Sequence, residues 1–131
     1  NVFAEDWAVP ASGACKVGYG STSPALLGLK ATSNPTIVTC EIVKEVGSNT
    51  LQNVFVRIKR TGGSTPFCFL YTQSPTSTTS SSTIKYASSL IGAQSLNLPL
   101  PSTQYYSGYA SVTCYLYQND IIYGVRYKQA N

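Results

Sequence analysis

The sequence predicts an all-β fold, an antiparallel sandwich of two sheets with about seven or eight strands and almost no helix. Several short segments alternate apolar with polar residues, which is the period of a half-buried strand. Turn-forming residues separate these segments at spacings of about 8 to 15 residues. The chain has 131 residues, of which 43% are hydrophobic and 11% charged, and this size and composition fit a single core.

The N-terminal residues 1–14 predict an extended arm, and residues 15–131 predict a single sandwich domain. The arm contains Phe3 and the only tryptophan, Trp7. These rings are expected either to cover an open edge of the protein's own core or to dock into another molecule, because a tryptophan is costly to leave in water. Residues 15–23 are rich in turn formers, and residues 25–32 are compatible with a short strand.

Residues 36–46 and 51–60 predict a hairpin, with a loop over 47–51. Both segments alternate, and the register that pairs Cys40 with Ile58 also places Glu41 opposite Arg57. Matching of apolar faces and pairing of opposite charges therefore select the same alignment.

Residues 65–73 predict a strand in which Cys68 points inward and Phe67, Phe69 and Tyr71 point outward. The following Ser/Thr-rich segment, 74–83, predicts a flexible loop and a candidate for O-glycosylation. Residues 83–90 and 95–101 add one or two further strands.

Residues 108–128 predict a second hairpin, turning at Asn119 and Asp120, which tolerate a positive φ. This register places Tyr115 opposite Gly124, so that the ring can fold over bare backbone. The outward face then carries further candidate binding residues, which are Tyr117, Ile122 and Arg126. With Phe67, Phe69 and Tyr71, they form the predicted binding surface, for a protein or for a glycan.

Four cysteines predict two disulfides. Cys15, Cys40, Cys68 and Cys114 have no CxxC spacing and the chain has no histidine, so a zinc site has neither the spacing nor the ligands. Pairing Cys15 with Cys40 would fasten the N-terminal region to a strong strand, and pairing Cys68 with Cys114 would join two inward-facing strands. Disulfides indicate a secreted, extracellular or cell-surface protein, from which a signal peptide has been removed.

The residue inventory predicts no enzyme, no cofactor and no metal site. The lack of histidine excludes Ser/His and Cys/His nucleophiles. Glu41 and Glu45 are about 13 Å apart along a strand, beyond the separation of glycosidase carboxylates. Residues 82–85 match a Ser-x-x-Lys pattern but lack its helical context.

The charge and hydropathy patterns also exclude two classes of partner. The net charge is +4, and its densest part is the short stretch Arg57, Lys59 and Arg60. This basic footprint is too small to predict nucleic-acid binding. No apolar run approaches the roughly 18 residues that predict a membrane-spanning helix, so membrane insertion is not expected.

The cysteine strands resemble those of a group of small secreted bacterial proteins, mostly uncharacterised, that are predicted to be β-sandwiches. The resemblance spans residues 15–127 and rests on the order of Cys15, Val38-Thr39-Cys40, Val54 to Arg57, Cys68 and Val112-Thr113-Cys114. It implies secretion, two disulfides and no catalytic site.

Three functions remain. The first is a non-enzymatic structural, filament-like or adhesive subunit that binds copies of itself or another extracellular protein through its aromatic face and N-terminal arm. The second is a carbohydrate-binding module that stacks tyrosines on a polysaccharide. The third is a secreted inhibitor. Tyrosines flanked by Ser, Thr and Gly suit protein contact and sugar stacking equally.

Overall fold

A computed structural model describes residues 5–26, 28–42, 51–76, 79–102 and 109–129. These residues form eleven strands and one short helix. In chain order they are β1 (Glu5–Pro10), α1 (Ala11–Ala14), β2 (Cys15–Tyr19), β3 (Thr22–Ala25), β4 (Gly28–Ala31), β5 (Thr36–Ile42), β6 (Leu51–Arg60), β7 (Phe67–Gln73), β8 (Ser80–Tyr86), β9 (Gly92–Leu98), β10 (Tyr109–Leu116) and β11 (Ile121–Gln129).

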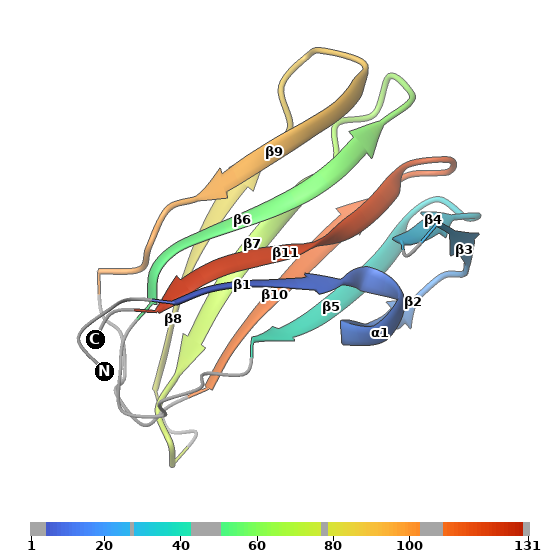
Figure 1. The fold of residues 1–131 in the computed structure, drawn as a ribbon. Coiled ribbons are helices and arrows are strands. Elements are labelled where there is room, and N and C mark those ends of the chain that lie inside the picture. Colours follow the sequence, from blue (N-terminus) through green and yellow to red (C-terminus); the bar gives the residue numbers. More distant parts are fainter. Residues whose placement is uncertain (1–4, 27, 43–50, 77–78, 103–108, 130–131) are drawn as a thin grey trace.

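Two antiparallel sheets form the layers of the predicted sandwich (Figure 1). Sheet A has the order β3-β4-β11-β6-β9, and β1 also pairs with β11. Sheet B has the order β2-β5-β10-β7-β8. The all-β sandwich is confirmed, but the strand count exceeds seven or eight. The turn-rich segment 15–23 contributes to two short strands, and β8 begins inside the predicted Ser/Thr-rich loop.

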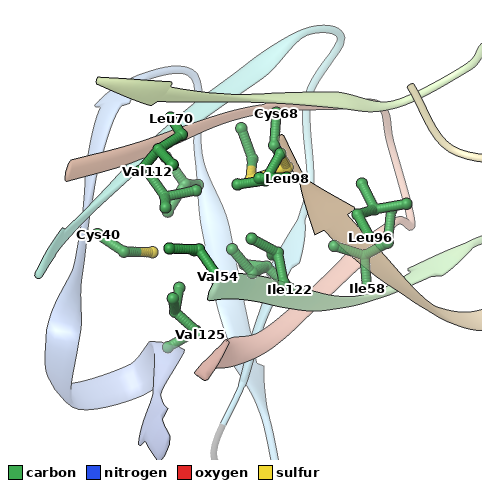
Figure 2. Close-up of a cluster of buried hydrophobic side chains, with 14 of the residues drawn as sticks. Cys40, Val54, Ile58, Cys68, Leu70, Leu96, Leu98, Val112, Ile122 and Val125 are labelled. Atoms are coloured by element: carbon green, nitrogen blue, oxygen red, sulfur yellow. A yellow bond between two sulfur atoms is a disulfide. The ribbon is translucent and has the colours of Figure 1, made fainter. Parts of the chain in front are cut away.

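The core lies between the two sheets and is built from alternate residues of each long strand. In β10, four inward residues are buried, and the residues between them are only partly buried. Figure 2 shows Val112 and Leu70 of sheet B facing Val54 and Val125 of sheet A. Burying each such side chain contributes about 1.5 to 3 kcal/mol, so the alternation of the strands is itself the main stabilising pattern.

Both disulfides have the expected pairing, and both lie within sheet B. Cys15 is directly opposite Cys40 in β2 and β5, and Cys68 is directly opposite Cys114 in β7 and β10. They close sequence separations of 25 and 46 residues. In the chain-entropy model these loops correspond to stabilisations of about 3.5 and about 4 kcal/mol.

The expected hairpin over 36–60 is wrong, because β5 belongs to sheet B and β6 to sheet A. Cys40 is opposite Val112 and not Ile58, and Glu41 is opposite Ser111 and not Arg57. The inward faces of β5 and β6 meet across the core, which requires the same alternation as pairing side by side. Residues 43–50, which contain most of the predicted loop, lie outside the described residues.

The expected pairing within 108–128 is also wrong, because the chain crosses between sheets after β10. Asp120 fixes this crossing: it is 1% exposed, and its carboxylate accepts hydrogen bonds from the Thr61 backbone N–H at 3.0 Å and the Tyr117 backbone N–H at 2.9 Å. The Thr61 hydroxyl donates a third at 3.1 Å. Because a buried carboxylate needs such donors, the turn is held at the end of β6. Asn119 has the expected positive φ, 79°.

A β-bulge in β11 reverses the expected sides of its first residues. Ile122 is opposite Ile58 and Gly124 is opposite Arg57, so Tyr123 is an extra residue on the β11 side. An inserted residue shifts the side-chain alternation by one, which lets Ile122 and Val125 both face the core. The prediction that Ile122 lies on the outer surface is therefore wrong, since its side chain is 0% exposed.

The bulge can be tested with two neighbouring isoleucines. Ile122→Ala should lower the free energy of unfolding by about 2 to 5 kcal/mol, because it removes buried methyl groups from the core. Ile121→Ala, a matched change at a partly exposed position, should cost clearly less. Urea unfolding monitored by circular dichroism would measure both, and a larger loss at Ile121 would show that β11 has no bulge.

Candidate functional site

The outer face of sheet B carries a row of large apolar side chains that crosses all five strands. The cross-strand register places them side by side, in the order Tyr19, Ile37, Tyr115, Phe67 and Tyr86. Each point of the row is one strand spacing from the next, so the row spans about 19 Å. We call this row, with Phe69, Tyr71 and Ile84 in the adjacent positions of β7 and β8, the aromatic face.

The rings of the aromatic face pack on one another. Phe67 and Tyr115 are stacked, with centroids 4.7 Å apart and planes at 13°, and Tyr86 lies against Phe67 at 5.1 Å and 41°. Phe69 meets Phe67 and Tyr115 edge-on, at 5.6 Å and 6.0 Å. Tyr71 is tilted against Phe69 at 5.8 Å. Such pairs contribute about 0.5 to 1.5 kcal/mol beyond their buried area, so the rings hold each other in fixed orientations.

The aromatic face is exposed at its margins and has little charge. Tyr19 is 61% exposed and Tyr86 55%, and both belong to edge strands of sheet B. Among the described outward positions of this sheet, the charged side chains are Lys16 and Glu41, one of each sign. A contiguous exposed apolar surface with balanced charge is typical of an interaction site.

Polar residues occupy the neighbouring part of the same sheet surface. Thr39 and Thr113 share a hydrogen bond between their hydroxyls at 3.1 Å. Beyond them is a small hollow of about 190 Å³, lined by Glu41, Tyr71, Gln73, Tyr109, Ala110 and Ser111. The face therefore changes from rings to hydroxyl, amide and carboxylate groups along its strands.

The structure brings together four of the predicted binding residues, Phe67, Phe69, Tyr71 and Tyr115. Tyr115 lies opposite Phe67 and Ile37, and not opposite Gly124 as expected.

The remaining predicted residues lie elsewhere. Tyr117 is in the turn between the sheets, Ile122 is in the core, and Arg126 is exposed on sheet A. Phe3 lies outside the described residues, and the backbone of Trp7 pairs opposite Tyr127 in β1.

Sequence reasoning missed four members of the aromatic face, Tyr19, Ile37, Ile84 and Tyr86. Alternation along β8 could have revealed Ile84 and Tyr86, which occupy outward positions two residues apart. Tyr19 lies in a segment that the sequence predicts to be rich in turns. Its position next to Ile37 depends on a register shift between Val17 and Tyr19.

A second concave feature lies on the outer face of sheet A. This sheet A groove has a volume of about 730 Å³. Its lining comes from β1, the turn between β3 and β4, and the strands β6, β9 and β11: Ala8, Val9, Pro10, Leu26, Phe55, Arg57, Ser95, Tyr123, Gly124, Val125 and Arg126. The groove and the aromatic face are thus on opposite outer surfaces of the sandwich.

No group of three or more His, Cys, Asp or Glu side chains within the described residues could hold a metal ion. Among the helices described, none has the length and apolar character needed to cross a membrane.

No protein-family model matches the sequence, and no curated protein does. A structure described as a low affinity xylan binding module, CBM86, from the gut symbiont Roseburia intestinalis, aligns with a TM-score of 0.46 and 11% identity. The alignment covers 97% of this chain and 96% of that chain. Similarity at this level assigns neither a family nor a ligand.

The stacking within the aromatic face can be measured with a double-mutant cycle on Phe67→Ala and Tyr115→Ala. We expect a coupling of about 0.5 to 1.5 kcal/mol in the free energy of unfolding, because the two rings stack directly. The matched cycle on Phe67→Ala and Tyr19→Ala should be additive to within about 0.5 kcal/mol, since two strands separate them. Equal coupling in both cycles would contradict the stacked arrangement.

Proposed function

We propose that this protein acts without catalysis, as an extracellular structural or adhesive subunit that associates with copies of itself through the aromatic face. The observation that carries the proposal is the cross-strand row from Tyr19 to Tyr86, with its stacked rings and exposed ends. The disulfides support an extracellular location, because such bonds persist in oxidising compartments.

The packing of the rings favours a protein partner over a sugar at this face. A pyranose stacks on the flat side of an aromatic ring, but Phe67 has Tyr115 and Tyr86 against it and Phe69 at its edge. The row therefore presents mainly ring edges and exposed side chains. Together they form a rigid, uneven surface into which apolar side chains of a partner can pack. Large rigid rings are enriched at the centres of protein interfaces.

Charge favours a second copy as the partner. Lys16 and Glu41 lie on the same face, so two copies related by a twofold axis can place opposite charges across the contact. By contrast, the outer side of sheet A carries Arg57, Lys59 and Arg126, which would repel their equivalents in a second copy.

The N-terminal strand is proposed as an additional contact. Within the chain, β1 pairs with β11 over six residues, and Ala11 directly after it is buried in the core. Docking of the arm into a neighbour therefore takes the form of strand exchange, in which β1 of one copy pairs with β11 of another.

A second function, carbohydrate binding, is favoured by a different observation, the sheet A groove. Phe55, Tyr123 and two arginines line this one concavity, whereas Tyr71 is the only ring of the aromatic face that lines the described hollow on sheet B.

Association through the aromatic face can be tested with the double variant Ile84→Ser with Tyr86→Ser. These exposed residues lie on the edge strand β8, so the change should abolish self-association while shifting the melting temperature by only a few degrees. Analytical ultracentrifugation over a range of concentrations would measure association.

The matched control is Leu90→Ser with Ile91→Ser, which removes two even more exposed apolar side chains from the segment before β9. The control should associate like the parent. Association that survives the β8 variant, or that is lost equally in the control, would contradict the proposal.

A further inference from the structure

We infer that the sheet A groove is a binding site for an acidic oligosaccharide, a short chain of sugars that carry carboxylates. The inference rests on the carbohydrate binding proposed above for this groove and specifies its ligand. The groove lies on the opposite side of the sandwich from the aromatic face, so the site is separate from the proposed contact between aromatic faces. Its volume of about 730 Å³ is within the range of small-molecule pockets.

The floor of the groove is formed where β11 and β6 run side by side. Phe55 is opposite Arg126, and Arg57 is opposite Gly124 on one side and Ser95 on the other. An aromatic ring and two guanidinium groups therefore alternate over two neighbouring strands. Arg57 donates a hydrogen bond to the Ser95 hydroxyl at 3.2 Å, which orients its guanidinium along the floor.

The bulge in β11 adds a second ring to the groove. β11 pairs with β4 at Ile121 and Ile122, and with β1 from Gly124 onward, so Tyr123 lies where the neighbouring strand changes. As the extra residue of the bulge, Tyr123 is turned to the outer side, where it lines the groove.

Gly124 lets β1, which forms one wall of the groove, lie close to β11. A Cβ atom at this position would meet the Val9 carbonyl oxygen and lie 3.3 Å from the Pro10 Cα. The absence of a side chain therefore allows β1 to approach β11 and to form an apolar wall. Leu26, in the turn between β3 and β4, is 94% exposed and also lines the groove.

The charges that surround the groove favour an anion. Arg57 and Arg126 line it, and Lys59 follows on the same outward side of β6, whereas Lys128 of β11 is opposite Asp6 of β1. A guanidinium group binds a carboxylate through two parallel hydrogen bonds, so Arg57, which is bonded to the neutral Ser95 hydroxyl, can hold a carboxylate of the sugar chain.

The position of the groove favours a sugar over a peptide. An extended peptide gains affinity by pairing with an open strand edge. The groove lies on the face of sheet A, where β11 already has β6 on one side and β4 and β1 on the other. Recognition must therefore come from side chains: Phe55 and Tyr123 offer rings for the apolar faces of pyranoses, and Ser95 and the arginines offer polar partners.

The test is isothermal titration of the intact protein with four tetrasaccharides and, separately, with a peptide of similar length. Three are acidic tetrasaccharides, of galacturonate, of mannuronate and of hyaluronan, and the fourth is neutral cellotetraose. We expect at least one acidic probe to bind about tenfold more tightly than cellotetraose, because charge-assisted hydrogen bonds to arginine distinguish them. A tetraglutamate peptide should bind no better than the neutral sugar.

Variants locate the site. Arg57→Gln and Tyr123→Ser should each lower the affinity for the best-binding acidic probe by about tenfold. The first change removes a charged donor, and the second removes a stacking ring. Lys85→Gln removes the same charge from β8 of the opposite sheet and should leave affinity unchanged. The inference would be overturned by equal binding of all sugars, by no binding of any acidic probe, by tighter binding of the peptide, or by an equal loss in Lys85→Gln. None of these outcomes bears on association through the aromatic face.

Discussion

The β-bulge at Tyr123 is the constraint on which most of sheet A depends. β11 pairs with β4, β6 and β1, so an error in its alternation would misplace the contacts of three strands. The extra residue lets Ile122 and Val125 both face the core, and it places Gly124 where β1 can approach closely. The bulge therefore joins two requirements, a continuous core on one side of β11 and a concave surface on the other.

Sheet B depends on uninterrupted alternation instead. In β7 and β10, every second residue is buried and both inward cysteines form one disulfide, so the residues between them are forced outward. Cross-strand register then brings outward residues of distant segments into one row. The same rule that builds the core thus also builds the aromatic face.

The disulfide pairing was predicted from the positions of the cysteines along the chain. The sequence was sufficient for the fold class and for the long strands, because both depend on local alternation. It was insufficient for the partners of the strands. Cys40 could lie next to Ile58 in the same sheet or on the facing sheet across the core. The apolar pattern of the two strands is the same in both cases. The crossing after β10 depends on Asp120 meeting Thr61, a contact between residues far apart in the chain.

The candidate sites show the same limit. Phe67, Phe69, Tyr71 and Tyr115 could be predicted to face outward from the period of their own strands. Ile122 could not be placed correctly, because a single extra residue reverses the side and leaves no local signal. The sheet A groove could not be predicted from the sequence, because it forms only when β1, the turn at Leu26 and β11 come together.

Two surfaces of different chemistry on opposite sides of one sandwich are the central feature of this account. The most direct measurement is the mapping of backbone amide chemical shifts by NMR, first over a dilution series and then during titration with the acidic tetrasaccharide that binds best. The account predicts that dilution shifts amides of β7, β8 and β10, whereas the sugar shifts those of β6 and β11 near Arg57 and Tyr123. Shifts confined to the same sheet in both experiments would contradict it.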